Sequence, residues 1–314
     1  MSEAAPPLSA APVPRPRDPF RTATGIISWA APVALVAIVL VLLSQAGPAL
    51  SRFGLGFFTG REWNPVNGHF GALPFIFGTV VTSLIALLIA VPVGVGVAIF
   101  LAQPSAARLR NAIGIGVELL AAIPSVVYGL WALFVMGPFV FKYLETPLNA
   151  HLAAIPLFAG TPRPTSIMTA ALILSIMILP TLAAISRDVI RAVPGGLREA
   201  SIALGATWWE TTWNVVLPAA RSGIVGATVL ALGRALGETI AVALVIGNRP
   251  DVQPSLLQPG STIASVIANE FNEATSPLHS AALVELGLIL ILITLTVNLF
   301  ALGLVNNNVR RRTA

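Results

Sequence analysis

The chain has 314 residues, of which 56% are hydrophobic and only 10% charged, with a net charge of +5 and a mean hydropathy of +0.86. A soluble domain carries about 25% charged residues, so this composition predicts an integral membrane protein. The absence of cysteine excludes disulfides, thiolate metal sites and cysteine catalysis.

The distribution of basic residues excludes several further functions. The single lysine, Lys142, follows no glycine-rich loop, so ATP hydrolysis at a phosphate-binding loop is excluded. The arginines stand at the ends of apolar runs rather than with aromatic residues along one face, so nucleic-acid binding is not expected. His69, His151 and His279 fall in separate predicted loops. We therefore expect no catalytic site, no metal and no cofactor.

The N-terminal segment 1–25 is rich in proline and alanine and is predicted to be a disordered cytoplasmic tail. The apolar run 26–48 is longer than a signal-peptide core of about 7–15 residues, which favours a retained first membrane helix. Cleavage after the SQA near its end is the alternative. Six apolar runs have the length of about 20 residues that a membrane helix needs: 26–48, 75–101, 113–141, 166–186, 223–247 and 281–304.

The loops between these spans predict the orientation in the membrane. With both termini cytoplasmic, most arginines lie on the inner side, as the positive-inside rule requires. This orientation leaves one substantial cytoplasmic loop, 187–222, and long outer loops at 49–74, 142–165 and 248–280. The last contains a stretch with helical apolar spacing, which predicts a short amphipathic helix. Glu118 and Glu285 lie near the ends of their spans and are expected to reach the membrane interface.

The stretch GGLREASIALGATWWETTWNVVLPAA, residues 195–220, is too polar to cross a membrane. It predicts one short helix, a sharp turn at Gly205, and a second helix that ends before Pro218. From the residues alone, it either lies on the lipid headgroups or docks to a partner.

Arg234 and Glu238 are the only ionisable residues between Gly223 and Gly247. Their spacing predicts that they share one face of one helix, near the middle of the fifth span. They either pair with each other to stabilise the bundle or line the route of a charged substrate. The arginine suits an oxyanion because its planar guanidinium can donate two charge-assisted hydrogen bonds. The glutamate would keep binding weak enough for release.

The chain contains EASIALG and, after a further nine residues, VVLP. This pattern resembles the EAA signature of permease subunits in binding-protein-dependent ABC importers. Glu199, Ala200, Gly205 and the Leu217-Pro218 pair stand at the matching spacings, whereas Ser201 replaces the usual alanine. The resemblance implies that this loop is a coupling helix, docked in a groove of the ATPase subunit. In that case Glu199 and its neighbours transmit ATP-driven closure to the membrane helices.

Three longer stretches, at 63–94, 121–133 and 232–248, resemble the phosphate branch of that family. The pattern WNP…FG.LP in the first favours its C type (PstC type) over the paralogous PstA type. The resemblance extends from about residue 54 to 304. It implies an all-α type I importer permease with six transmembrane helices, a permease domain over 26–314 and its core at about 75–304. In that branch the GRALGET segment carries charges critical for translocation, which here are Arg234 and Glu238.

The resemblance also implies the setting of the protein. It predicts a multi-pass protein of the bacterial cytoplasmic (inner) membrane that translocates phosphate. The partners would be a homologous PstA-type permease, two ATPase subunits, an external phosphate-binding protein and membrane lipid. The alternatives are a permease for another oxyanion, such as phosphonate, sulfate or molybdate, and a secondary proton-coupled carrier. The EAA-like loop and the lack of an inverted repeat argue against the carrier.

Overall fold

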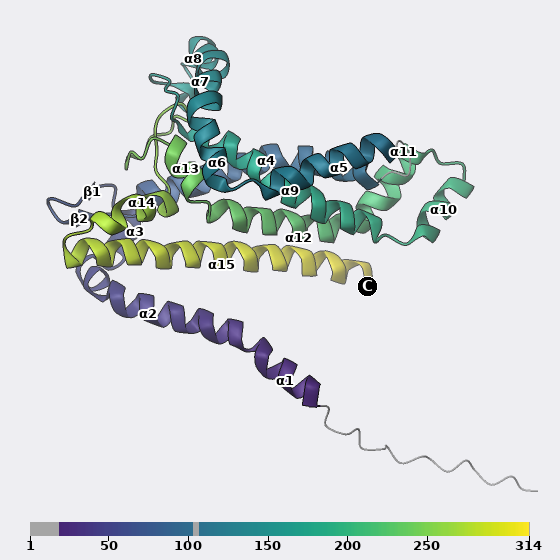
Figure 1. Ribbon diagram of the computed structural model, residues 1–314, viewed down its shortest axis with the longest axis horizontal. Helices are drawn as coiled ribbons and strands as arrows, with labels where there is room; N and C mark the ends of the chain where they lie inside the picture. The colour runs from purple at the N-terminus through teal and green to yellow at the C-terminus, as the bar shows by residue number, and fades with distance from the viewer. Residues whose placement is uncertain (1–18, 103–106, 314) are drawn as a thin grey trace, which may run out of the picture.

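The computed structural model describes residues 19–102 and 107–313 as a bundle of long helices (Figure 1). Six helical segments in these two ranges are long and apolar enough to cross a membrane, which confirms the predicted number: Ala23–Phe53, Leu73–Ala102, Ser125–Leu152, Ile167–Arg191, Trp208–Leu236 and Pro277–Phe300. Most of the predicted tail, 1–25, lies outside the described residues, but its last part is helical because α1 (Pro19–Ser28) begins there.

The first span contacts the rest of the bundle mainly through one long helix. This span consists of α1 and α2 (Ala30–Phe53), and α2 packs against α15 (Pro277–Thr313). Only Ala46 and Ala49 of α2 are buried, whereas Leu35, Leu40 and most of its other apolar side chains are exposed. Figure 1 shows α2 diverging from α15 toward α1. The first span therefore offers most of its apolar surface to lipid or to a partner chain.

A compact cap closes one end of the bundle. It contains α3 (Gly56–Thr59), β1 (Trp63–Asn64), β2 (His69–Phe70), α14 (Ile263–Glu270) and η5 (Phe271–Glu273). The two strands pair antiparallel, with Trp63 opposite Phe70 and Asn64 opposite His69. The Trp63 indole donates a hydrogen bond of 2.9 Å to Glu270. The predicted amphipathic helix is thus confirmed as α14, and its apolar face packs into the core.

The most extensive contact in the bundle joins α4 (Leu73–Ala102) and α9 (Ile167–Arg191). Every fourth residue of α4 from Gly78 to Ala98 is small and buried. Small side chains let membrane helices approach closely, which increases van der Waals contact where lipid supplies no hydrophobic driving force. The helix α12 (Leu217–Leu236) packs against the same core through Ala227, Ala231 and Ala235.

The predicted third span, 113–141, is wrong because the chain breaks at Pro124. This residue has extended backbone, with φ of −60° and ψ of 143°, and separates α5 (Ala107–Ala122) from α6 (Ser125–Trp131). The helical run then continues through η1 (Ala132–Met136), α7 (Gly137–Val140), η2 (Phe141–Glu145) and α8 (Thr146–Leu152). Much of the predicted outer loop 142–165 is therefore helical, with a further turn at η3 (Pro156–Phe158). Figure 1 shows α7 and α8 projecting sideways from the bundle.

The predicted boundaries of the cytoplasmic loop and the fifth span are also wrong. Between α10 (Gly195–Ala203) and α12 lie α11 (Trp208–Thr211) and η4 (Thr212–Val216), and helix is continuous from Trp208 to Leu236. Pro218 does not end a helix, because the wide π turn of η4 precedes it and Pro218 occupies the first turn of α12. Helix α12 ends at Leu236, and α13 (Ile240–Val245) follows. The fifth span thus ends earlier than predicted.

Candidate coupling loop and translocation site

The loop that carries the EAA-like signature folds as a helix followed by a tight turn. Helix α10 contains Glu199 and Ala200, and the turn places Gly205 at φ +88°. This left-handed conformation strains any residue with a side chain, which explains the glycine. The Ala200 carbonyl accepts a hydrogen bond from the Leu204 N–H at 3.2 Å, and the Ile202 carbonyl accepts one from Gly205 at 2.9 Å. The predicted helix and turn are confirmed.

Two side chains of α10 fix the loop to the membrane helices. A terminal nitrogen of Arg198 donates a hydrogen bond of 2.6 Å to the Ile190 carbonyl, in the last turn of α9. The Ser201 and Thr211 hydroxyls are 3.0 Å apart, which joins α10 to α11. In α11, Thr207 and Glu210 form a capping box. No local pattern in the sequence indicates the roles of Arg198 and Thr211, and Ser201 stands out only as a departure from the family pattern.

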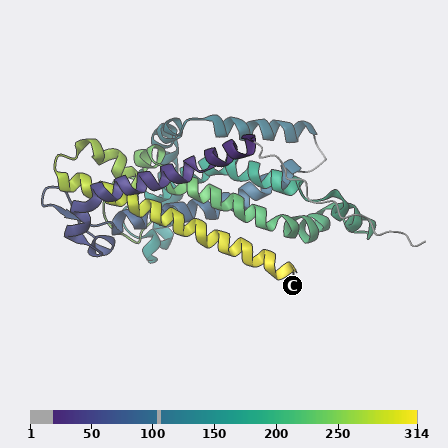
Figure 2. The same cartoon turned by 90° about the horizontal axis from the view of Figure 1, so that it is seen from below.

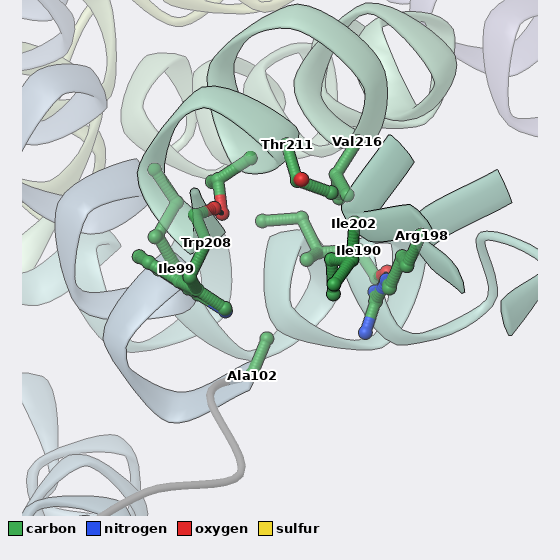
Figure 3. Close-up of a pocket in the computed structure, with 9 residues that line it drawn as sticks. Ile99, Ala102, Ile190, Arg198, Ile202, Trp208, Thr211 and Val216 are labelled. Atoms are coloured by element: carbon green, nitrogen blue, oxygen red, sulfur yellow. Dashed lines mark hydrogen bonds between the residues drawn. The ribbon is translucent and has the colours of Figure 1, made fainter. Parts of the chain in front are cut away.

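A small cavity of about 140 Å³ lies beneath the loop. Figure 3 shows Arg198, Ile190 and Ile202 along one side of it and Trp208 and Ile99 along the other. The lining is mostly apolar, and the Nε of Arg198 is buried without a partner among the described residues. The loop is thus held by a few polar contacts around an incompletely filled apolar space.

The outer surface of α10 is open to a partner. Glu199, Ala200 and Gly205 are exposed, and so are the apolar side chains of Leu197, Ile202 and Leu204. Leu217 and Pro218, the other matched positions, are half-buried at the start of α12. The structure therefore divides the signature into an exposed part that could dock and a packed part at the start of α12, inside the fifth span.

Arg234 and Glu238 do not share one continuous helix, contrary to the prediction. Arg234 is exposed in the last turn of α12, and Gly237 ends that helix. Glu238 is half-buried in the short break before α13. Among the described residues no ion pair joins the two side chains. The interpretation that they stabilise the bundle by pairing has no support in this geometry.

The break itself is a signal for a functional site. Figure 1 shows that α15 extends well beyond the end of α12, so the break lies within the length of the bundle. Irregular backbone at membrane depth is tolerated where it is buried in protein or lines a cavity, and broken helices recur at transporter substrate sites. Arg234 therefore lies beside a helix break and Glu238 lies within it, rather than both in the middle of a continuous span.

Two other acidic residues lie where the sequence did not indicate. Glu285 on α15 is 2% exposed, and neither carboxylate oxygen has a partner among the described residues, so the expectation that it reaches the interface is wrong. Glu145 is fully buried and accepts a hydrogen bond of 2.5 Å from Ser166, the N-cap of α9. The sequence does not indicate this residue, because it falls in the predicted outer loop 142–165. Glu118, in contrast, is exposed on α5.

Residues 94–314 match the family model described as binding-protein-dependent transport system inner membrane component. This match covers more than half of the chain, and the chain belongs to that family. It is a multi-pass component of the inner membrane and not an enzyme.

Individual relatives indicate which kind of transport permease this chain resembles. The proteins named phosphate transport system permease protein PstC from Xylella fastidiosa and Mesorhizobium japonicum are 47% and 49% identical to this chain. These alignments cover 86% and 83% of this chain and 84% and 81% of the relatives. The protein of that name from Pasteurella multocida is 45% identical over 88% of both chains.

Solved structures of ABC transporters share the fold. The inward-facing MetNI methionine ABC transporter has a TM-score of 0.55 at 18% identity and covers 74% of this chain and 94% of its own. A bacterial ABC transporter involved in the import of the acidic polysaccharide alginate has a TM-score of 0.55 at 19% identity, over 91% of this chain and 99% of its own. The predicted type I importer permease fold is confirmed.

Proposed function

We propose that this chain is the PstC-type permease subunit of an importer that moves inorganic phosphate across the bacterial inner membrane. The observation that carries the proposal is the identity of 45–49%, over more than four fifths of each chain, with permeases of that name from three organisms. ATP is hydrolysed by separate ATPase subunits. Phosphonate, sulfate and molybdate, the alternative substrates, have no support of this kind.

The complete importer contains a PstA-type permease, two ATPase subunits and an external phosphate-binding protein. The exposed acidic and apolar surface of α10 supports the contact with an ATPase subunit. Arg187, Arg191 and Arg198 lie at the end of the bundle that carries α10, so we assign that end to the cytoplasm. In Figure 1, α1 and the end of α15 point toward that same end of the bundle, which supports a cytoplasmic location for both termini.

The coupling path follows from the contacts of α10. When the ATPase subunits close, they move α10 through Glu199 and the residues around the Gly205 turn. The Arg198 hydrogen bond carries this movement to α9, and the contact between Ser201 and Thr211 carries it to α11. Helix is continuous from there to Leu236, so a displacement at α11 reaches the far end of α12 as a rigid-body motion.

Arg234 stands at that far end and is the residue we assign to phosphate. Its guanidinium offers a planar set of donors to two phosphate oxygens. Glu238, in the break that follows α12, contributes a negative charge that weakens phosphate binding and allows release. Because the pair is not joined in an ion pair, the guanidinium is free to contact substrate.

The test is uptake by the reconstituted complex. Proteoliposomes that contain all four components and ATP should accumulate labelled phosphate, with competition by unlabelled phosphate and little by sulfate, molybdate or phosphonate. Uptake of one of those anions in place of phosphate would contradict the proposed substrate. The chain alone, given a proton gradient, should move no phosphate, and uptake without an ATPase subunit would favour the secondary carrier.

A further inference from the structure

A polar cleft lies between α4, α5 and α9, far along the bundle from the break at Gly237. Its volume is about 290 Å³, and three arginines line it: Arg110 from α5, and Arg187 and Arg191 from α9. Helix α4 ends at Ala102 and α9 at Arg191, so the cleft opens where two spans end. Figure 2 shows α5 along the edge of the bundle, toward the end that carries α10 and α11. Because two spans end here, we place the cleft at the level of the lipid headgroups.

The α9 wall presents two guanidinium groups one helical turn apart. A terminal nitrogen of Arg191 donates a hydrogen bond of 2.7 Å to the Leu101 carbonyl, which fixes this side chain against α4. The Nε of Arg187 is 2.9 Å from Asp188, whose side chain is 64% exposed and does not line the cleft. Within the described ranges the terminal nitrogens of Arg187 donate no hydrogen bond. They are available to an anion.

The α5 wall adds charge and leaves room. Arg110 and Asn111 lie in its first two turns, and Gly114 follows one turn later on the same face. A Cβ at Gly114 would meet only the Leu101 side chain, at 3.9 Å, so the missing side chain keeps the cleft open. Glu118, one more turn along, makes no ion pair with a described residue. Three positive charges thus face one negative charge across the space.

We propose that this cleft binds a phosphate group, at a site separate from Arg234. Guanidinium groups bind phosphate oxygens through paired charge-assisted hydrogen bonds, and basic pockets between membrane helices hold anionic headgroups. The phosphate group belongs either to an anionic phospholipid, whose apolar part would contact Leu101 and Ile115, or to free inorganic phosphate. The proposal does not depend on which anion the importer carries.

The experiment uses the assembled importer in two kinds of lipid nanodisc. In one arm the disc contains phosphatidylcholine with a minority of phosphatidylglycerol, and native mass spectrometry counts the retained anionic lipid. In the other arm the disc contains phosphatidylcholine alone, and equilibrium binding of labelled inorganic phosphate is measured. Every sample carries Arg234→Gln, so that the proposed translocation site does not contribute to phosphate binding.

Four changes test the cleft. Arg110→Gln with Arg187→Gln should weaken binding by about tenfold or more, since charge-assisted hydrogen bonds to phosphate are the strong ones and the change removes two positive charges. Gly114→Leu should block the cleft. Glu118→Gln should tighten binding, because it removes the negative charge from the lining. Arg108→Gln is the matched control, since Arg108 is an exposed arginine of α5 that does not line the cleft, and it should change nothing.

The outcome identifies the source as well as the site. A loss in the first arm assigns the cleft to a phospholipid headgroup, and a loss in the second assigns it to inorganic phosphate. The proposal is overturned if the double variant binds like the parent in both arms, or if Glu118→Gln weakens binding instead of tightening it. The Glu118 and Gly114 variants keep the test valid if the double variant fails to assemble.

Discussion

The hydroxyl oxygens of Ser201 and Thr211 are 3.0 Å apart and join the coupling helix α10 to the helix that continues into the fifth span. Ser201 stands where the EAA signature usually has alanine, and Thr211 is 3% exposed. The serine that departs from the signature thus has a hydrogen-bonding partner, Thr211, ten residues later in the chain. Removing either hydroxyl leaves the other group without this hydrogen bond at a partly buried position.

The first prediction concerns this pair. Ser201→Ala and Thr211→Val should each lower the free energy of unfolding by about 1 kcal/mol, the net value of one buried hydrogen bond. The double variant should lose less than the sum of the two, because neither hydroxyl is then left alone. Thermal or denaturant unfolding of the detergent-solubilised complex measures the three values. Strict additivity would show that the two hydroxyls are not coupled.

A second prediction tests docking at α10. Glu199→Lys reverses a charge on the exposed surface, and Gly205→Glu places a side chain at φ +88°, so both should separate ATP hydrolysis from transport. Gly196→Ala is the control, since Gly196 lies in the same helix with ordinary backbone and open space. Phosphate uptake per ATP hydrolysed should fall in the first two variants and stay at the parental value in the third. Phosphate uptake at the parental rate by both Glu199→Lys and Gly205→Glu would contradict the assignment of α10 as the coupling helix.

The third prediction concerns Arg234 and Glu238. Arg234→Gln should abolish uptake with or without Glu238→Gln, because the two side chains do not pair and the loss is that of the phosphate contact. Arg234→Lys should also be impaired, since an ammonium lacks the planar set of donors. Glu238→Gln alone should retard release. Uptake is normalised to protein assembled in the membrane.

The control for these variants is Arg249→Gln, which removes an exposed arginine in the segment after α13. It should transport like the parent. Near-parental uptake by the variant that combines Arg234→Gln with Glu238→Gln would instead show that the two residues have a structural role.

The fourth prediction tests the packing of α4. A Cβ at Gly78 would lie 2.0 Å from the Ser261 carbonyl oxygen, whereas one at Gly96 in the same helix would meet nothing within 4 Å. Gly78→Ala should therefore destabilise the protein by about 1–3 kcal/mol, the cost of overpacking a well-filled core. Gly96→Ala should be neutral. The amount of assembled complex and its melting temperature measure the difference between the two variants. Equal values for both variants would show that the structure around Gly78 adjusts to an added methyl group at little cost.

Much of the site could be predicted from local features of the sequence. The helix and turn around Gly205 follow from the residues themselves, because only glycine adopts a positive φ without strain. The number of spans follows from hydropathy and length, which the bilayer fixes. The family follows from the spacing of Glu199, Gly205 and Pro218. These properties depend on residues that are close in the sequence, on the length of each apolar segment or on the lipid bilayer around it.

Only the tertiary structure decided where the helices break and what lies beside each charged group. A proline or glycine in an apolar run is compatible with a continuous or a broken membrane helix, because neighbouring helices can satisfy the freed backbone groups. Pro124 breaks its helix, Pro218 lies inside the continuous helix from Trp208 to Leu236, and Gly237 separates Arg234 from Glu238. The basic cleft likewise joins α5 and α9, which are far apart in the sequence. Hydropathy determined that the chain crosses the membrane, but helix packing determined which charges face one another.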